Sequence, residues 1–344
     1  MKNSLTFSVT ALLVIVCYGF RAQTCGAELP PLPDKEGFAG SFAGVSNGAL
    51  LVAGGANFPD KKPWEGGTKV WYDQVYVLEK PTGKWQIAGK LPHALGYGAA
   101  VQFTDRLICI GGSDATQHYK DVFFLDWKDG KLQTVKLPEL PIAMANCCGV
   151  MVGNHLFVAG GLSSPMSNKT LNRIFCMHLT ARDPEWKEIA PCPGGGRMLA
   201  VAANLNDQFW LISGVDLIVD NSGKPQRKYL QDAYSYHMEK GWKRHADLPW
   251  PTVAAPSPAP VHENSLFVLG GDDGTQVAVP PNQHQGFQKT ILRYSTAEDK
   301  WLKIGKLKLP TVTTSTAFWN QQWVIPTGET RPGVRTPIVG TFRP

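Results

Sequence analysis

Leu50-Leu51-Val52-Ala53-Gly54-Gly55 is an apolar run that ends in two glycines, and it decides the fold because the chain repeats it. Further copies, two of them degenerate, occupy residues 107–112, 156–161, 209–214, 266–271 and 323–328. The six final glycines are therefore 49 to 57 residues apart. A constant period of this length predicts a repeat architecture.

Each unit holds further strand-like segments around this run. An Ala- and Gly-rich segment precedes it, as at 97–101, and an alternating segment follows it, as at 121–125. A strand marked by tryptophan comes next, with Trp85, Trp186, Trp242 and Trp301. Four strands per unit predict an all-β, six-bladed β-propeller that forms one domain over residues 23–344. Independent hairpins of a β-sandwich would not keep this register through six units.

The sixth unit is short, because only residues 338–342 remain after Thr336 for a strand and no tryptophan strand follows. We expect residues 27–33 at the other end of the domain to supply the missing outer strand and close the ring. Pairing the two ends would hide open sheet edges. Removal of residues 29–33 is therefore predicted to destabilise the whole domain.

The N-terminus has the pattern of a secretory signal. Lys2 precedes a mostly apolar stretch over residues 5–20, and we assign 1–22 to a signal peptide whose cleavage point stays open. A membrane anchor is the alternative, but the apolar run is short for a bilayer span. The mature protein is expected to be exported to the bacterial periplasm, without stable membrane insertion.

Composition narrows the class of ligand. The net charge of +6 is spread without a long basic run, which argues against nucleic acid as a partner. Cys109 and Cys176 lie in apolar runs and are expected in the core, and disulfide pairing is not readable from the spacing. Paired Cys-x-x-Cys units and clustered histidines are lacking, so we expect neither a metal nor a cofactor.

The loop after the sixth copy, Gly328-Glu329-Thr330-Arg331-Pro332-Gly333-Val334-Arg335-Thr336, carries charges that the other copies lack. Pro332-Gly333 predicts a tight turn that folds Glu329 and Arg335 toward each other. Loops after the inner strands converge near a propeller axis, where ligands bind. On spacing alone, an exposed salt-bridged loop is the simpler interpretation.

The glycine pair and the later tryptophan resemble the kelch repeat. The charged loop resembles the Gly-Glu-x-x-Pro-Gly-x-Arg-Thr segment of the bacterial N-acetylneuraminate epimerases, or sialic acid mutarotases, which are six-bladed kelch propellers. Residues 37–47 and 51–58 are similar to the segment that follows this motif in the family. Here the motif stands at the C-terminus instead, so the chain resembles a cyclically permuted member.

The resemblance implies mutarotation of N-acetylneuraminate, a small sugar acid, by Glu329 and Arg335. Glu329 would be the general acid and base, and Arg335 would hold the sugar's carboxylate through paired hydrogen bonds. Candidate substrate contacts come from segments similar to the family and from loop arginines; they are Asn57, Glu65, Lys69, Arg197 and Arg227.

Two other classes of function stay open from the sequence. A non-catalytic kelch propeller would bind a glycan or a protein partner. Another enzyme on a similar scaffold is the second possibility. A sialidase would show repeated Ser-x-Asp-x-Gly-x-x-Trp boxes, which the sequence lacks, and a copper oxidase would need a Tyr and His ligand set that is not evident.

Overall fold

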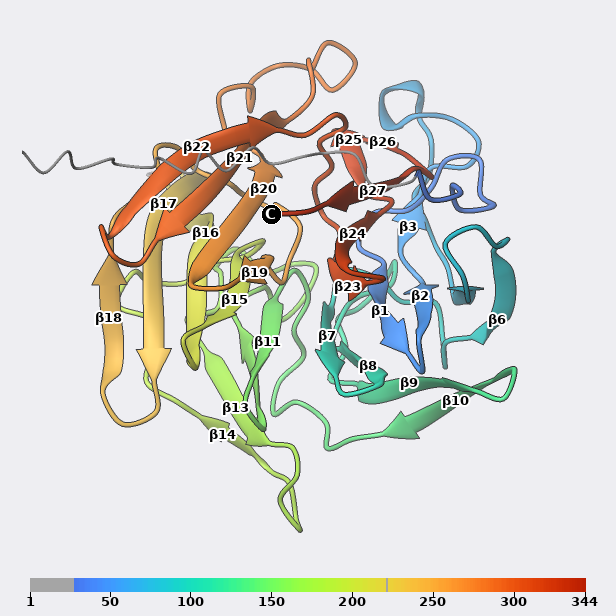
Figure 1. The fold of residues 1–344 in the computed structure, drawn as a ribbon. Helices are drawn as coiled ribbons and strands as arrows, with labels where there is room; N and C mark the ends of the chain where they lie inside the picture. The colour runs from blue at the N-terminus through green and yellow to red at the C-terminus, as the bar shows by residue number, and fades with distance from the viewer. Residues whose placement is uncertain (1–27, 221) are drawn as a thin grey trace, which may run out of the picture.

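The computed structural model describes residues 28–220 and 222–344, so the expected signal peptide at 1–22 lies outside the described residues. Five four-stranded sheets and one three-stranded sheet surround a common axis (Figure 1). The six-bladed propeller is thereby confirmed. Across the described ranges, no helix is both long enough and apolar enough to cross a membrane.

The blades follow one another in chain order. Within each blade the strands are arranged in sequence from the axis to the rim, and each strand is antiparallel to its neighbours. Blades 1 to 3 are β1 (Phe42–Ser46), β2 (Ala49–Ala53), β5 (Gln74–Leu78), β6 (Gln86–Lys90); β7 (Ala99–Phe103), β8 (Arg106–Ile110), β9 (Val122–Lys128), β10 (Lys131–Lys136); β11 (Cys148–Val152), β12 (His155–Ala159), β13 (Ile174–His178), β14 (Trp186–Glu188). Blades 4 to 6 are β15 (Val201–Leu205), β16 (Gln208–Val219), β17 (Pro225–His237), β18 (Gly241–His245); β19 (Val261–His262), β20 (Ser265–Gly271), β21 (Gln288–Ser295), β22 (Lys300–Lys306); β23 (Ala317–Trp319), β24 (Gln322–Pro326), β27 (Val339–Phe342).

Packing between blades explains why the second strand of each unit is a continuous apolar run. All five residues of β2 are buried, because both faces of the sheet are covered by neighbouring blades. The recurring tryptophans join the blades at the rim, where each indole N–H donates to a backbone carbonyl in the link from the preceding blade. The pairs are Trp85 to Pro30, Trp186 to Pro138, Trp242 to Ala190 and Trp301 to Ala246, at 2.8–2.9 Å.

A closed ring of six backbone hydrogen bonds surrounds the axis. Each blade contributes one residue with φ between 55° and 69°, just before its inner strand. Each of these N–H groups donates, at 2.7–2.9 Å, to the carbonyl of its counterpart in the preceding blade, and the first blade donates to the sixth. The six residues, which we call the axial ring, are Gly40, Tyr97, Asn146, Leu199, Ala254 and Thr313. These bonds hold five non-glycine residues in a left-handed conformation that they adopt rarely.

The ring closes differently from the sequence expectation. Residues 28–33 form no strand, because prolines at 30, 31 and 33 lack the N–H groups that a sheet ladder needs. Instead, Leu32 N–H donates to the carbonyl of Pro337 at 2.9 Å, as Leu91 donates to Asp73 in the link after blade 1. The described N-terminal segment is therefore the link into blade 1, and blade 6 has three strands within the described residues.

Cys109 and Cys176 are buried in the core, as expected. All five cysteines of the described residues are free thiols, and burial raises the pKa of Cys147 to about 12. Four of them are buried core side chains, and Cys147 is partly buried against the core.

Candidate active site

The charged loop forms a two-stranded hairpin on one face of the propeller, β25 (Glu329–Arg331) with β26 (Val334–Arg335). Pro332 and Gly333 make the turn, and Gly333 has φ 80°. Glu329 and Arg335 are cross-strand partners, and Arg335 Nη1 lies 2.9 Å from Glu329 Oε1. The angles at this contact lie outside hydrogen-bond geometry, so we describe it as an ion pair. The predicted approach of the two residues is confirmed.

Arg335 is enclosed by three blades. Its side chain is only 3% exposed, and its Nε donates to the carbonyl of Ala56 at 3.4 Å. Its Nη2 donates to the hydroxyl of Tyr97 at 3.4 Å, and the guanidinium lies 4.7 Å from the ring centre of Phe58. Nε and Nη2 are therefore hydrogen-bonded within the protein, and Nη1 has the ion pair with Glu329 alone.

Glu329 is more open, with 18% of its side chain exposed. Oε1 faces Arg335 and also accepts a long hydrogen bond from Gly333 N–H at 3.3 Å. Oε2 has one weak contact, from the hydroxyl of Thr313 at 3.5 Å. Oε2 is therefore the freer of the two carboxylate oxygens. It lies next to the axial ring, to which Thr313 belongs.

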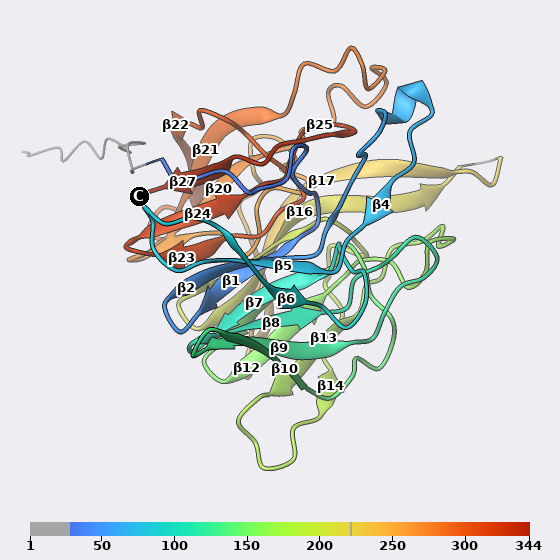
Figure 2. The same ribbon diagram turned by 90° about the vertical axis from the view of Figure 1, so that its right-hand side faces the viewer.

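A second hairpin, β3 (Ala56–Asn57) with β4 (Val70–Trp71), brings Lys69 to the same place. The Lys69 ammonium lies 5.1 Å from the ring centre of Trp71 and 5.0 Å from that of Tyr97. The Tyr97 ring thus contacts Lys69 while its hydroxyl contacts Arg335. Figure 2 shows β4 and β25 on the side of the propeller from which the β16–β17 hairpin also projects.

Two predicted contacts in blade 1 have other roles in the structure. Asn57 is 1% exposed; its amide donates to Asp34 and to the carbonyl of Gly37, and its oxygen accepts from Tyr72. Glu65, at the end of the short 3-10 helix η1 (Pro63–Glu65), is exposed, and its carboxylate accepts from Lys62 N–H at 3.0 Å.

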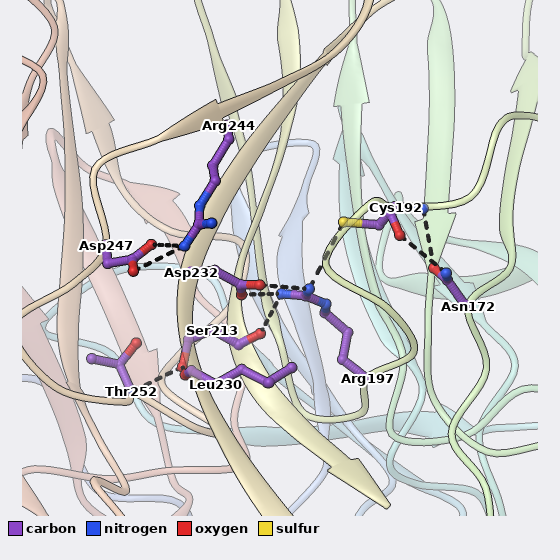
Figure 3. Close-up of polar contacts among 9 residues, drawn as sticks. All are labelled: Asn172, Cys192, Arg197, Ser213, Leu230, Asp232, Arg244, Asp247 and Thr252. Carbon is purple, nitrogen blue, oxygen red and sulfur yellow. Dashed lines mark hydrogen bonds and ion pairs between the residues drawn. The ribbon is translucent and has the colours of Figure 1, made fainter.

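Arg197 is a buried structural charge (Figure 3). Its side chain is 1% exposed, and Nη1 and Nη2 pair with Asp232 at 2.7 and 3.2 Å, while Nη1 also donates to the carbonyl of Ser213. Burial opposes the charged form, but the pairing with Asp232 outweighs it and raises the pKa of Arg197. Arg227 is exposed near the start of β17.

The structure thus links Glu329, Arg335 and Lys69 through the ion pair and Tyr97. The side chains of Asn57, Glu65 and Arg197 are engaged by other partners, and that of Arg227 is exposed. The sequence reasoning missed Tyr97 and Thr313 as members of this site. Tyr97 carried a readable signal, since a large aromatic residue opens a segment that is otherwise rich in Ala and Gly. Thr313 carried none.

An apolar cluster lies in front of blades 3 to 5, where the same loops come together. It is formed by buried Val215, Val253 and Val312 with partly buried side chains around them, namely Leu162, Leu199, Leu217, Tyr229 and Phe287. Val312 also pairs through its backbone with Glu329. The apolar cluster therefore adjoins the charged residues through the Val312–Glu329 backbone pair.

Known proteins resemble this chain in part of its sequence and in its fold. Residues 24–134 match the family described as N-acetylneuraminate epimerase. The N-acetylneuraminate epimerase of Salmonella arizonae is 42% identical in an alignment 119 residues long that covers 31% of this chain and 30% of that protein. That of Yersinia pestis is 43% identical in an alignment 126 residues long that covers 30% of this chain and 31% of that protein.

These matches confirm the resemblance to the N-acetylneuraminate epimerases, although they span less than a third of the relatives' length. Glu329 and Arg335 lie outside residues 24–134. A solved structure titled "Structure of YjhT" superimposes with a TM-score of 0.64, covering 91% of this chain and 95% of that one at 18% identity. At this identity the likeness shows a shared fold.

Proposed function

We propose that the protein is a sialic acid mutarotase, an isomerase that interconverts the α and β anomers of N-acetylneuraminate. The observation that carries this proposal is the Glu329 carboxylate, fixed by Arg335 on one oxygen and open on the other at the front of the axis. The names of the partial relatives supply the substrate.

The reaction needs one proton removed and one delivered. Glu329 Oε2 accepts the proton of the anomeric hydroxyl as the bond between the anomeric carbon and the ring oxygen breaks, and a proton is returned to that ring oxygen. The open-chain keto acid then recloses on the other face by the reverse steps. A positioned carboxylate of this kind typically contributes about 10²- to 10⁴-fold in rate.

The charges around the site favour an anionic sugar. Of the three charged residues gathered at the site, Arg335 and Lys69 are cations and Glu329 is an anion, so a net positive charge remains in a partly buried place. Such a field attracts and orients a carboxylate. The partly buried members of the apolar cluster, such as Tyr229 and Phe287, would contact the less polar parts of the ligand.

We also propose that the chain is cyclically permuted relative to its partial relatives and is exported after removal of residues 1–22. The permutation is supported by the axial junction of the two ends, where Gly328 N–H donates to Phe38 and Gly40 N–H donates to Thr313. A cut between neighbouring strands of a closed ring preserves the fold.

Proton NMR tests the proposed activity. A sialidase that releases the α anomer supplies the starting material, and the growth of the β anomer is followed with and without this protein. Faster equilibration with the protein supports the proposal. An unchanged rate at micromolar protein overturns it, and binding of a glycan polymer under the same conditions would then favour the non-catalytic alternative.

A further inference from the structure

We propose that Lys69, and not Arg335, binds the carboxylate of the substrate, and that Arg335 is a positioning residue for Glu329. This inference rests on the proposed function of the same site. It assigns the two cations of the site to different tasks, and these tasks are separable by experiment.

Arg335 is already occupied and covered. Its three nitrogens face Ala56, Tyr97 and Glu329, and only 3% of its side chain is exposed. A substrate carboxylate would have to displace Glu329 from it, and that would leave the proposed base without its partner. Breaking a buried pair is costly because a desolvated charge is left uncompensated. Arg335 therefore orients Glu329 by holding Oε1.

Lys69 has the opposite character. Its side chain is partly buried beside Trp71 and Tyr97, and within the described ranges it forms no ion pair. Contact with aromatic faces attracts the ammonium but leaves its N–H donors unused. An anion is the partner that these donors lack, and a carboxylate accepts charge-assisted hydrogen bonds from an ammonium.

Tyr97 contacts both cations, Lys69 through its ring and Arg335 through its hydroxyl. Its ring centre is 5.0 Å from the Lys69 ammonium, and its hydroxyl is 3.4 Å from Arg335 Nη2. Tyr97 is thus a shared neighbour of the Lys69 ammonium and of Arg335, the partner of Glu329. In a 2-keto sugar acid the carboxyl carbon is bonded directly to the anomeric carbon. A carboxylate held by Lys69 would therefore bring the anomeric hydroxyl toward Glu329.

Arg331 does not fill this role, because its guanidinium lies 5.5 Å from the ring centre of Trp64 and donates to the carbonyl of Asn282. It is directed to the η1 loop and the β20–β21 loop. Arg227 is exposed on the projecting hairpin. Lys69 is the cation that adjoins Tyr97 and remains available.

The test compares N-acetylneuraminate with its methyl ester, which keeps the sugar and removes the negative charge. Lys69→Met is expected to raise KM for the acid about 10- to 100-fold with little change in kcat, and to change KM for the ester little. Lys69→Arg should restore most of the affinity. Arg335→Lys should lower kcat for acid and ester alike. Lys61→Met, at an exposed lysine of the same loop, is the control and should match the wild type.

Binding separates this inference from the proposed function. Titration of the acid and the ester into Glu329→Gln protein, with and without Lys69→Met, measures the affinity for each ligand in the absence of turnover. Selective loss of acid binding supports the role of Lys69 even if the wild type fails to catalyse anomer exchange. The assignment is overturned if the Glu329→Gln protein binds the acid equally well with and without Lys69→Met. It is also overturned if Arg335→Lys raises KM for the acid but not for the ester.

Discussion

Glu329 lies directly opposite Arg335 across the Pro332-Gly333 turn, and their side chains form an ion pair of 2.9 Å. One hairpin therefore fixes both the position and the partner of the proposed base. Because the pair is local in sequence, its geometry depends on the turn more than on the distant blades.

Replacing Glu329 by Gln should abolish most of the activity while the fold persists. The amide keeps the shape of the side chain but cannot accept a proton, so kcat for anomer exchange should fall by about 10²- to 10⁴-fold. Exchange rates by NMR and thermal unfolding by circular dichroism measure the two effects. Glu65→Gln is the matched control, because Glu65 is an exposed carboxylate on η1. Full activity of Glu329→Gln would remove Glu329 from the mechanism.

Gly333→Ala should harm activity more than Gly130→Ala. Both glycines have positive φ, 80° and 71°, so each alanine should cost about 1–2 kcal/mol of stability. A Cβ at Gly333 would lie 2.6 Å from Pro63 Cγ, whereas a Cβ at Gly130 meets nothing within 4 Å. The hairpin must therefore shift only in Gly333→Ala, and Glu329 shifts with it. Equal kcat in the two variants would show that the turn does not position the base.

Asp232→Asn should destabilise the protein without weakening substrate binding. It leaves the guanidinium of Arg197 buried with a weaker partner, and breaking such pairs costs about 3–5 kcal/mol. Asp247→Asn is the control, since the Arg244–Asp247 pair beside it is exposed and should matter little (Figure 3). Urea unfolding measures stability. A large rise in KM in folded Asp232→Asn protein would instead return Arg197 to the substrate site.

Stability should fall as the pH drops below about 6.5, partly because of His245. Burial, followed by the charge of Lys243, lowers the pKa of this histidine in the folded protein. The unfolded chain then takes up a proton that the folded protein does not, so the free energy of unfolding is full above pH 6.5 and declines below it.

His245→Gln should flatten this decline but not remove it, because burial also lowers the pKa of His118 and His155. Urea unfolding between pH 7.5 and 5 measures the slope in the wild type and in the variant. An unchanged slope in His245→Gln would contradict the assignment.

The architecture was predictable because it repeats. Glycine-terminated strands and rim tryptophans recur in the sequence, and the turn at Pro332-Gly333 is set by local chemistry. The sequence predicted where the ring closes but not how it closes. The prolines at 30, 31 and 33 rule out a strand over these residues, and they are visible in the sequence.

The remaining site geometry depends on contacts between distant parts of the chain. Arg335 and Tyr97 are 238 residues apart, and Arg197 meets Asp232 across 35 residues. Sequence patterns show that these side chains are charged or aromatic but not which of them are enclosed. The enclosure of Arg335 is the reason why we propose Lys69 as the group that binds the carboxylate.

The central claim is tested most directly by exchange NMR on N-acetylneuraminate at equilibrium. Magnetisation transfer between the α and β signals should increase in proportion to the concentration of the wild-type protein and stay at the uncatalysed rate with Glu329→Gln. Transfer that is no faster with the wild-type protein than in buffer would contradict the account.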